Sequence, residues 1–122
     1  MKTYPELVAE AKTRVREVTV EQVLQQQAKG EDVVYVDVRE ESEWDAGHMP
    51  GAVHLGRGVL EVKVNQVFPD PATPLVLYCA GGNRSALAAD VLQVMGYSNV
   101  ASMIGGWRAW TQAGGETERG DT

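Results

Sequence analysis

The sequence predicts a three-layer α/β domain, with a mainly parallel central sheet flanked by helices on both faces. Short β-prone runs alternate with helical segments along the chain, which is the pattern of strand–helix–strand units. Residues 75–78 (Leu-Val-Leu-Tyr) are apolar or aromatic throughout, as in a central parallel strand covered on both faces. The 122 residues, 43% hydrophobic and 23% charged, suffice for one globular domain.

The N-terminal half carries signals for three helices and three strands. An apolar stripe recurs at helical spacing after Pro5, and Thr19 with Gln22 forms a capping box that begins a second helix. Residues 33–38 form a β-branched and aromatic run long enough for a buried strand. The expected elements are helices over residues 5–15, 19–27 and 41–46 and strands over 17–18, 33–38 and 52–55.

The C-terminal half continues the alternation. Apolar positions from Ser85 to Met95 recur at helical spacing, and Gly96 supplies a stop. The expected elements are helices over residues 59–67 and 85–95, strands over 75–78 and 99–103, and a final helix bearing Trp107 and Trp110. We divide the chain into an N-terminal amphipathic helical arm (1–16), a main domain (17–115) and a polar, glycine-rich flexible tail (116–122).

Cys79, the only cysteine, directly follows the expected central strand and precedes a helix, where open α/β sheets place their active sites. An ordinary cysteine has a pKa near 8.5, so only about 3% is thiolate at neutral pH. Free amides at the helix N-terminus and the guanidinium of Arg84 favour the anion. Gly81 and Gly82 allow the backbone to curl into an anion nest. A buried structural cysteine is the alternative, but the Gly-Gly turn and the arginine favour a reactive one.

Three motifs in order resemble the rhodanese (sulfurtransferase) family. Cys79-Ala80-Gly81-Gly82-Asn83-Arg84-Ser85 is similar to the family's active-site loop. Residues 37–40 with 43–44 and 47–52 are similar to the segment before that loop, and residues 105–110 to its closing helix. The resemblance covers about residues 18–115 and implies the rhodanese fold, with Cys79 as the catalytic residue. It also implies a substrate-binding loop made of Ala80, Gly81, Gly82, Asn83, Arg84 and Ser85.

The same resemblance implies supporting roles near the site. Asp37 and Arg39 are expected to hold neighbouring loops together, with Glu43, and His48 lies in a turn that is architectural in the family. A histidine serving as general base for the cysteine is the less favoured alternative for His48 and His54. Arg57, together with Lys63, is a candidate for local positive charge, because its segment borders the active-site mouth in the family.

The resemblance implies a sulfurtransferase. Cys79 would take a sulfane sulfur from an anionic donor such as thiosulfate, hold it as a persulfide, and pass it to cyanide, a thiol or a thioredoxin-like protein. No metal or organic cofactor is expected. One alternative is a sulfur-carrier or protein-interaction module. A cysteine phosphatase or arsenate reductase is less favoured, because those enzymes resemble His-Cys-x5-Arg, whereas here Tyr78 precedes the cysteine and four residues separate it from Arg84.

Composition narrows the range of partners. A net charge of −6 argues against nucleic acids and anionic membranes. A single cysteine excludes an internal disulfide, a CxxC redox pair and a cysteine-rich zinc site. With no apolar signal core at the N-terminus and no run of membrane-spanning length, we expect a cytoplasmic protein.

Overall fold

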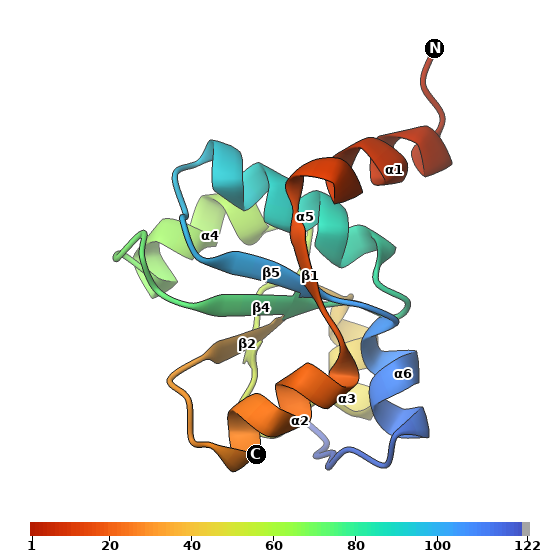
Figure 1. Cartoon of the computed structure of the whole chain (residues 1–122), viewed down its shortest axis with the longest axis vertical. Helices are drawn as coiled ribbons and strands as arrows, with labels where there is room; N and C mark the ends of the chain where they lie inside the picture. Colours follow the sequence, from red (N-terminus) through yellow and green to blue (C-terminus); the bar gives the residue numbers. More distant parts are fainter. Residues whose placement is uncertain (121–122) are drawn as a thin grey trace.

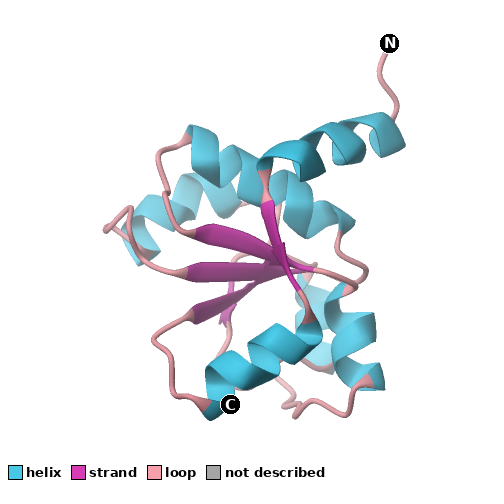
Figure 2. Ribbon diagram, viewed as in Figure 1, coloured by secondary structure: helices cyan, strands magenta, loops and turns pink. Residues whose placement is uncertain are grey.

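The computed structural model, which describes residues 1–120, has a central parallel sheet between two layers of helices (Figures 1 and 2). Within those residues the sheet has five strands in the order β1-β5-β4-β2-β3, and every neighbouring pair is parallel. The predicted α/β architecture is therefore confirmed. The strands are β1 (Arg16–Val18), β2 (Val34–Asp37), β3 (Val53–His54), β4 (Leu75–Tyr78) and β5 (Val100–Met103).

Alternate side chains of the central strand β4 enter two separate cores. Leu75 and Leu77 belong to the core on one face of the sheet, and Val76 and Tyr78 belong to the core on the other. This alternation follows from the two-residue period of a strand, and it explains why the whole run is apolar. Helices α1 (Tyr4–Arg14), α4 (Leu60–Val67) and α5 (Asn83–Val94) cover the first face, and α2 (Val20–Ala28), α3 (Glu41–Ala46) and α6 (Gly106–Gln112) cover the second (Figure 1).

The capping box predicted at the start of α2 is present. The Thr19 hydroxyl accepts the Gln22 backbone N–H at 3.1 Å, and the Gln22 side chain accepts the Thr19 N–H at 2.8 Å. Two N–H groups that the helix itself leaves without acceptors are thereby satisfied. The cap fixes where the chain turns from β1 into α2 at the carboxyl edge of the sheet.

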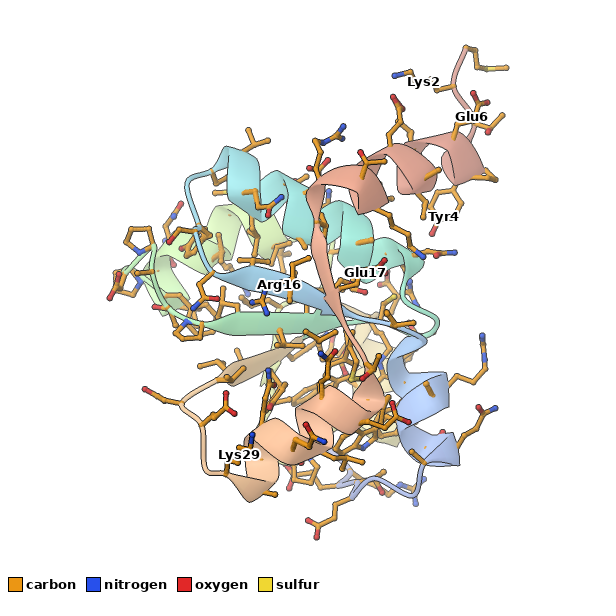
Figure 3. The ribbon with its side chains drawn as sticks, viewed as in Figure 1. Lys2, Tyr4, Glu6, Arg16, Glu17 and Lys29 are labelled. Atoms are coloured by element: carbon orange, nitrogen blue, oxygen red, sulfur yellow. The ribbon has the colours of Figure 1, made fainter. Side chains whose placement is uncertain are left out.

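The N-terminal helix α1 packs on α5, the helix that follows Cys79. Val8 and Ala11 are buried in this contact, and the Arg14 guanidinium donates to both carboxylate oxygens of Asp90 at 3.0 and 2.7 Å. The opposite end of α1, with Tyr4 exposed, extends away from the body of the domain (Figure 3). The arm thus covers part of the core with its C-terminal half.

The C-terminal segment makes defined contacts as far as Gly120. Glu118 and His48 exchange backbone hydrogen bonds of 2.9 and 3.0 Å, and the Gly120 N–H donates to the Asp45 carbonyl at 3.1 Å. The polar composition of residues 116–122 predicts a flexible tail. Composition alone holds no signal for this pairing, because the partner residues lie about 70 positions earlier in the chain. Residues 121–122 of that expected tail lie outside the described residues.

Candidate active site

Cys79 lies at the carboxyl edge of the sheet, directly after β4 and at the start of the loop that leads into α5. Its side chain is buried, with 1% of the residue exposed. The loop closes at Gly82, which caps α5 with φ of +99°. That left-handed conformation strains any residue with a Cβ, so glycine is required at this position. The structure therefore places Cys79 where the sequence predicted it.

The Cys79 sulfur faces a set of hydrogen-bond donors. The Gly82 N–H donates to Sγ at 3.0 Å, and the Cys79 thiol donates to the Ser85 hydroxyl oxygen at 3.5 Å. Once the thiol has lost its proton, the Ser85 hydroxyl can donate to the sulfur in return. Burial is the largest single influence and raises the pKa of Cys79. The Ser85 hydroxyl and the N–H groups of Ser85, Gly82 and Gly81 together outweigh it, so that the pKa lies below its usual value. The arrangement therefore stabilises a thiolate.

Ser102, on β5, extends this set through a hydrogen bond to Ser85. Its hydroxyl lies 2.7 Å from the Ser85 hydroxyl, and both serines are fully buried. When Ser102 donates to Ser85, the Ser85 proton is directed to the sulfur, and the chain of hydroxyls ends on the anion. Ser102 could not be predicted from the sequence, because a serine within a strand carries no local signal of such a role.

The first turn of α6 fixes the shape of the loop. The Trp107 N–H donates to the Cys79 carbonyl at 2.7 Å, and the Arg108 N–H donates to the Ala80 carbonyl at 3.1 Å. A Cβ on Gly106 would overlap the Cys79 carbonyl oxygen, so only glycine permits this approach. With these carbonyls held by α6, the following amides are free to turn toward the sulfur.

Arg84 pairs with Glu43 rather than standing alone beside the cysteine. Its Nη1 and Nη2 donate to Oε1 and Oε2 of Glu43 at 3.1 and 3.2 Å. The Arg84 hydrogen bonds hold the pKa of Glu43 below its usual range, so the pair is ionic at neutral pH. Glu43, expected to act with Asp37 and Arg39, is therefore the partner of the loop arginine.

Asp37 and Arg39 form a buried ion pair beside the site. The Arg39 guanidinium donates to Asp37 at 2.7 Å and to the Gly47 carbonyl at 2.6 Å, and it lies 4.8 Å from the Trp107 ring centroid. These contacts join β2, the turn after α3 and the start of α6. The geometry fits the loop-holding role that the resemblance implied for Asp37 and Arg39.

Both histidines bond to groups other than the cysteine. His48 Nδ1 lies 2.9 Å from the Trp44 carbonyl and Nε2 lies 3.3 Å from Glu118, and its ring stacks on that of Trp44. His54 Nε2 lies 2.8 Å from the Arg39 carbonyl. Within residues 1–120 no hydrogen bond links Cys79 to a histidine. The general-base alternative thus gains no geometric support.

Arg57 and Asn83, also predicted at the site, form no hydrogen bond with the Cys79 sulfur among the described residues. The Arg57 guanidinium forms an ion pair with Glu61 at 2.7 Å, and the Arg57 backbone N–H donates to Val38. Within the described chain, these bonds join Arg57 to α4 and β2, not to the Cys79 loop. Asn83 is the first residue of α5 and is exposed.

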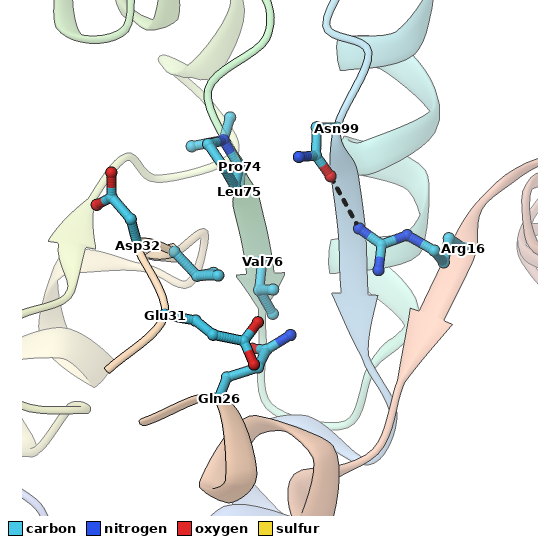
Figure 4. Close-up of a pocket in the computed structure, with 9 residues that line it drawn as sticks. Arg16, Gln26, Glu31, Asp32, Pro74, Leu75, Val76 and Asn99 are labelled. Carbon is cyan, nitrogen blue, oxygen red and sulfur yellow. Dashed lines mark hydrogen bonds between the residues drawn. The ribbon is translucent and has the colours of Figure 1, made fainter. Parts of the chain in front are cut away.

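A hollow of about 350 Å³ lies at the opposite, amino edge of the sheet (Figure 4). In it Arg16 donates to the Asn99 side chain at 3.1 Å. Glu31 and Asp32 supply negative charge there, and no cysteine or serine lines the hollow.

Within residues 1–120, no three His, Cys, Asp or Glu side chains gather as metal ligands. Over the same residues, no helix is long and apolar enough to cross a membrane.

Comparison with known families identifies this arrangement. The model of the Rhodanese-like domain matches residues 19–113. The chain belongs to the rhodanese-like family. Among curated relatives, this rhodanese-like chain is 33% identical over 100 residues to "Sulfurtransferase" of Allochromatium vinosum, covering 82% of this chain and 92% of that protein. It is 30% identical over 110 residues to "Putative sulfur carrier protein YrkF" of Bacillus subtilis, covering 90% of this chain but only 57% of that protein.

Solved structures give the same rhodanese fold. Thiosulfate sulfurtransferase from Pseudomonas aeruginosa superposes with a TM-score of 0.80 at 27% identity, over 95% of this chain and 22% of that one. A Rhodopseudomonas palustris protein named "Protein of Unknown Function RPA3614, Possible Tyrosine Phosphatase" superposes with a TM-score of 0.90 at 35% identity, over 97% and 96% of the two chains. The predicted rhodanese fold is confirmed, and the family is one of sulfurtransferases and sulfur carriers.

Proposed function

We propose that this rhodanese-like protein transfers a sulfane sulfur from thiosulfate, or from a persulfide donor, to cyanide or a thiol. The observation that carries the proposal is the convergence of Gly82 N–H and the Ser85 hydroxyl on a single buried Cys79 sulfur. Donors so placed lower the thiol pKa and raise the fraction of Cys79 that is the nucleophilic thiolate. The relative named as a sulfurtransferase supports the reaction class.

The reaction has two steps that balance in charge and sulfur. In the first, the Cys79 thiolate attacks the outer sulfur of thiosulfate, a bond from Sγ to that sulfur forms, and sulfite leaves with the electron pair of the broken S–S bond. In the second, cyanide or a thiolate attacks the outer sulfur of the persulfide and regenerates the thiolate. The persulfide is itself an anion, so the same loop amides stabilise it. No outside oxidant or reductant is consumed.

The loop residues have different roles in the proposed reaction. Gly81, Gly82 and Ser85 stabilise the sulfur anion, and Ala80 anchors the loop through its carbonyl. Arg84 adds guanidinium donors beside the loop, and Glu43 holds them in place. Asp37, Arg39 and His48 maintain the surrounding turns. We propose that Arg57, which is paired with Glu61, donates to an anionic sulfur donor only at close range.

Two other functions are tested by the same assays. A sulfur carrier, as the name of one relative suggests, would load only from a protein persulfide and would not turn over thiosulfate. A phosphatase would hydrolyse an aryl phosphate. The loop from Cys79 to Arg84 holds four intervening residues, and none of them is an acid that could protonate a leaving alcohol.

The cytoplasmic location expected from the sequence stays a prediction.

The test is a donor screen combined with intact-protein mass spectrometry. Thiosulfate without acceptor should add one sulfur atom, because the single cysteine leaves no second thiol to release it internally. Cyanide should remove the adduct, and Cys79→Ser should neither form it nor turn over thiosulfate. Turnover that persists in Cys79→Ser, or turnover without any adduct, would refute the proposal. Loading from a protein persulfide alone would favour the carrier.

A further inference from the structure

The cations around the Cys79 loop differ in whether their charge is offset. Arg84 is held by both oxygens of Glu43, and Arg57 is held by Glu61. Each of these pairs has no net charge, so at a distance an approaching anion meets a dipole and not a cation. Because the whole chain carries a net charge of −6, attraction of a dianion must come from an uncompensated local charge.

Arg108 is such a charge. It is exposed, and within residues 1–120 its guanidinium has no carboxylate partner. Its helix α6 contains no acidic residue, and neither does the segment from Ile104 to Gly106 that precedes it. Within residues 1–120, no ion pair therefore offsets this cation.

The position of Arg108 relative to the cysteine is fixed by the backbone. Its N–H donates to the Ala80 carbonyl, and a Cβ placed on Gly81 would lie 3.4 Å from Arg108 Nη1. Gly81 itself is exposed, and its amide is one of the groups that lower the pKa of Cys79. Two residues of chain span at most about 7 Å, so the distance from the guanidinium to the sulfur is well within the Debye length of about 30 Å that holds at 0.01 M salt.

Lys63, the other cation suggested for this role, lies in different surroundings. It lines a polar cleft together with Arg39, Glu40 and Glu41. The two carboxylates there oppose the attraction of an anion. Arg108, with no such neighbours on its own helix, is better placed for that role.

We infer that Arg108 is the residue that recognises the anionic co-substrate, a small sulfur oxyanion, at the mouth of the Cys79 loop. This inference rests on the proposed function for the identity of the anion. The attraction of Arg108 for an anion near Cys79 does not depend on that function. The Arg108 guanidinium attracts the dianionic donor and can donate to its oxygens. Neutral reagents gain nothing from it.

The test uses a pair of alkylating reagents that differ in charge. Rates of Cys79 modification by iodoacetate and iodoacetamide are measured above the thiol midpoint, so that their ratio reports the local potential and not the thiolate fraction. We expect Arg108→Ala to lower this ratio about three- to tenfold at low salt, with the difference shrinking in high salt. Arg108→Lys should keep most of the ratio. Arg16→Ala, which removes the same charge at the amino edge, should leave it unchanged.

A wild-type ratio in Arg108→Ala, or an equal loss in Arg16→Ala, would overturn the inference. The kinetic counterpart is a raised KM for thiosulfate in Arg108→Ala with kcat kept within about twofold. Because alkylation needs no sulfur transfer, a protein that fails to turn over thiosulfate still yields the ratio. Failure of the proposed function and failure of the Arg108 assignment are therefore separate results.

Discussion

The two edges of the sheet differ in how they present polar groups. At the amino edge, long side chains such as Arg16, Glu31 and Asp32 surround an open hollow of about 350 Å³ and point to no common atom (Figure 4). At the carboxyl edge, a backbone amide and a hydroxyl converge on the Cys79 sulfur, which is almost wholly buried. The edge with the sulfur is the one where α2, α5 and α6 begin.

Hollows of similar size, about 350 to 400 Å³, lie at both edges, so the convergence of polar groups on one sulfur is what distinguishes the carboxyl edge. In a parallel sheet each strand delivers its following helix to the carboxyl edge, so free N–H groups gather there. The hollow at the other edge is lined by side chains from several elements. Substitutions that act on one edge alone test this difference between the two edges.

Gly82→Ala should have the largest effect. A Cβ at φ of +99° is strained, and it would lie 3.1 Å from the Gly105 nitrogen. The loop must shift, and the Gly82 N–H then leaves the sulfur, a charge-assisted bond whose loss costs about 10- to 100-fold in activity at neutral pH. Sulfur-transfer rate and circular dichroism together check this. Gly58→Ala is the matched control, because a Cβ there meets nothing within 4 Å.

The hydroxyl pair should control the pH dependence. Because the pKa of Cys79 is lowered, its alkylation rate should rise with pH and level off at a lower pH than for an ordinary cysteine. Ser85→Ala removes the hydroxyl that bonds Sγ and should move this midpoint to higher pH. Ser102→Ala should move it less, because Ser85 remains but can turn its proton to a backbone carbonyl.

Iodoacetamide rates across pH give these midpoints. Ser102→Thr should restore the wild-type midpoint, since it keeps the hydroxyl. Val100→Ala serves as the control for lost packing in β5, because it removes buried methyl groups and no hydroxyl. An unchanged midpoint in both Ser85→Ala and Ser102→Ala would show that the backbone amides alone stabilise the thiolate.

Removal of residues 1–13 should have the smallest effect on chemistry. These residues lie at neither edge, but Val8 and Ala11 are buried against α5. Losing that burial costs roughly 2–3 kcal/mol, which should lower Tm by about 6–12 °C. Specific activity of the folded truncation should remain within about twofold of wild type. A folded truncation without activity would place α1 in the active site.

Local patterns were enough to predict the sheet and the position of Cys79. The run Leu75–Tyr78 is a strand with the predicted bounds, because all four of its positions are buried and so leave a continuous apolar signal. The Gly-Gly turn predicted the loop, since few other sequences tolerate a left-handed cap. These features depend on residues close together in the chain.

Pairings between distant residues could not be predicted in this way. Arg84 and Glu43 are 41 positions apart, and no spacing rule says which acid an arginine selects. Ser102 meets Ser85 only because β5 lies beside β4 in the folded sheet. Arg108 was visible as part of a motif, but its closeness to Gly81 follows from how α6 docks on the loop.

The bridge between Glu118 and His48 has a consequence for how the protein unfolds. The region that matches the family ends at residue 113, yet Glu118 supplies a hydrogen-bond partner to a buried imidazole. The same turn provides the Gly47 carbonyl that binds Arg39. The ordered structure therefore extends beyond the homologous region as a segment held by these hydrogen bonds. Amide exchange at His48 should report detachment of the C-terminal segment before the sheet itself opens.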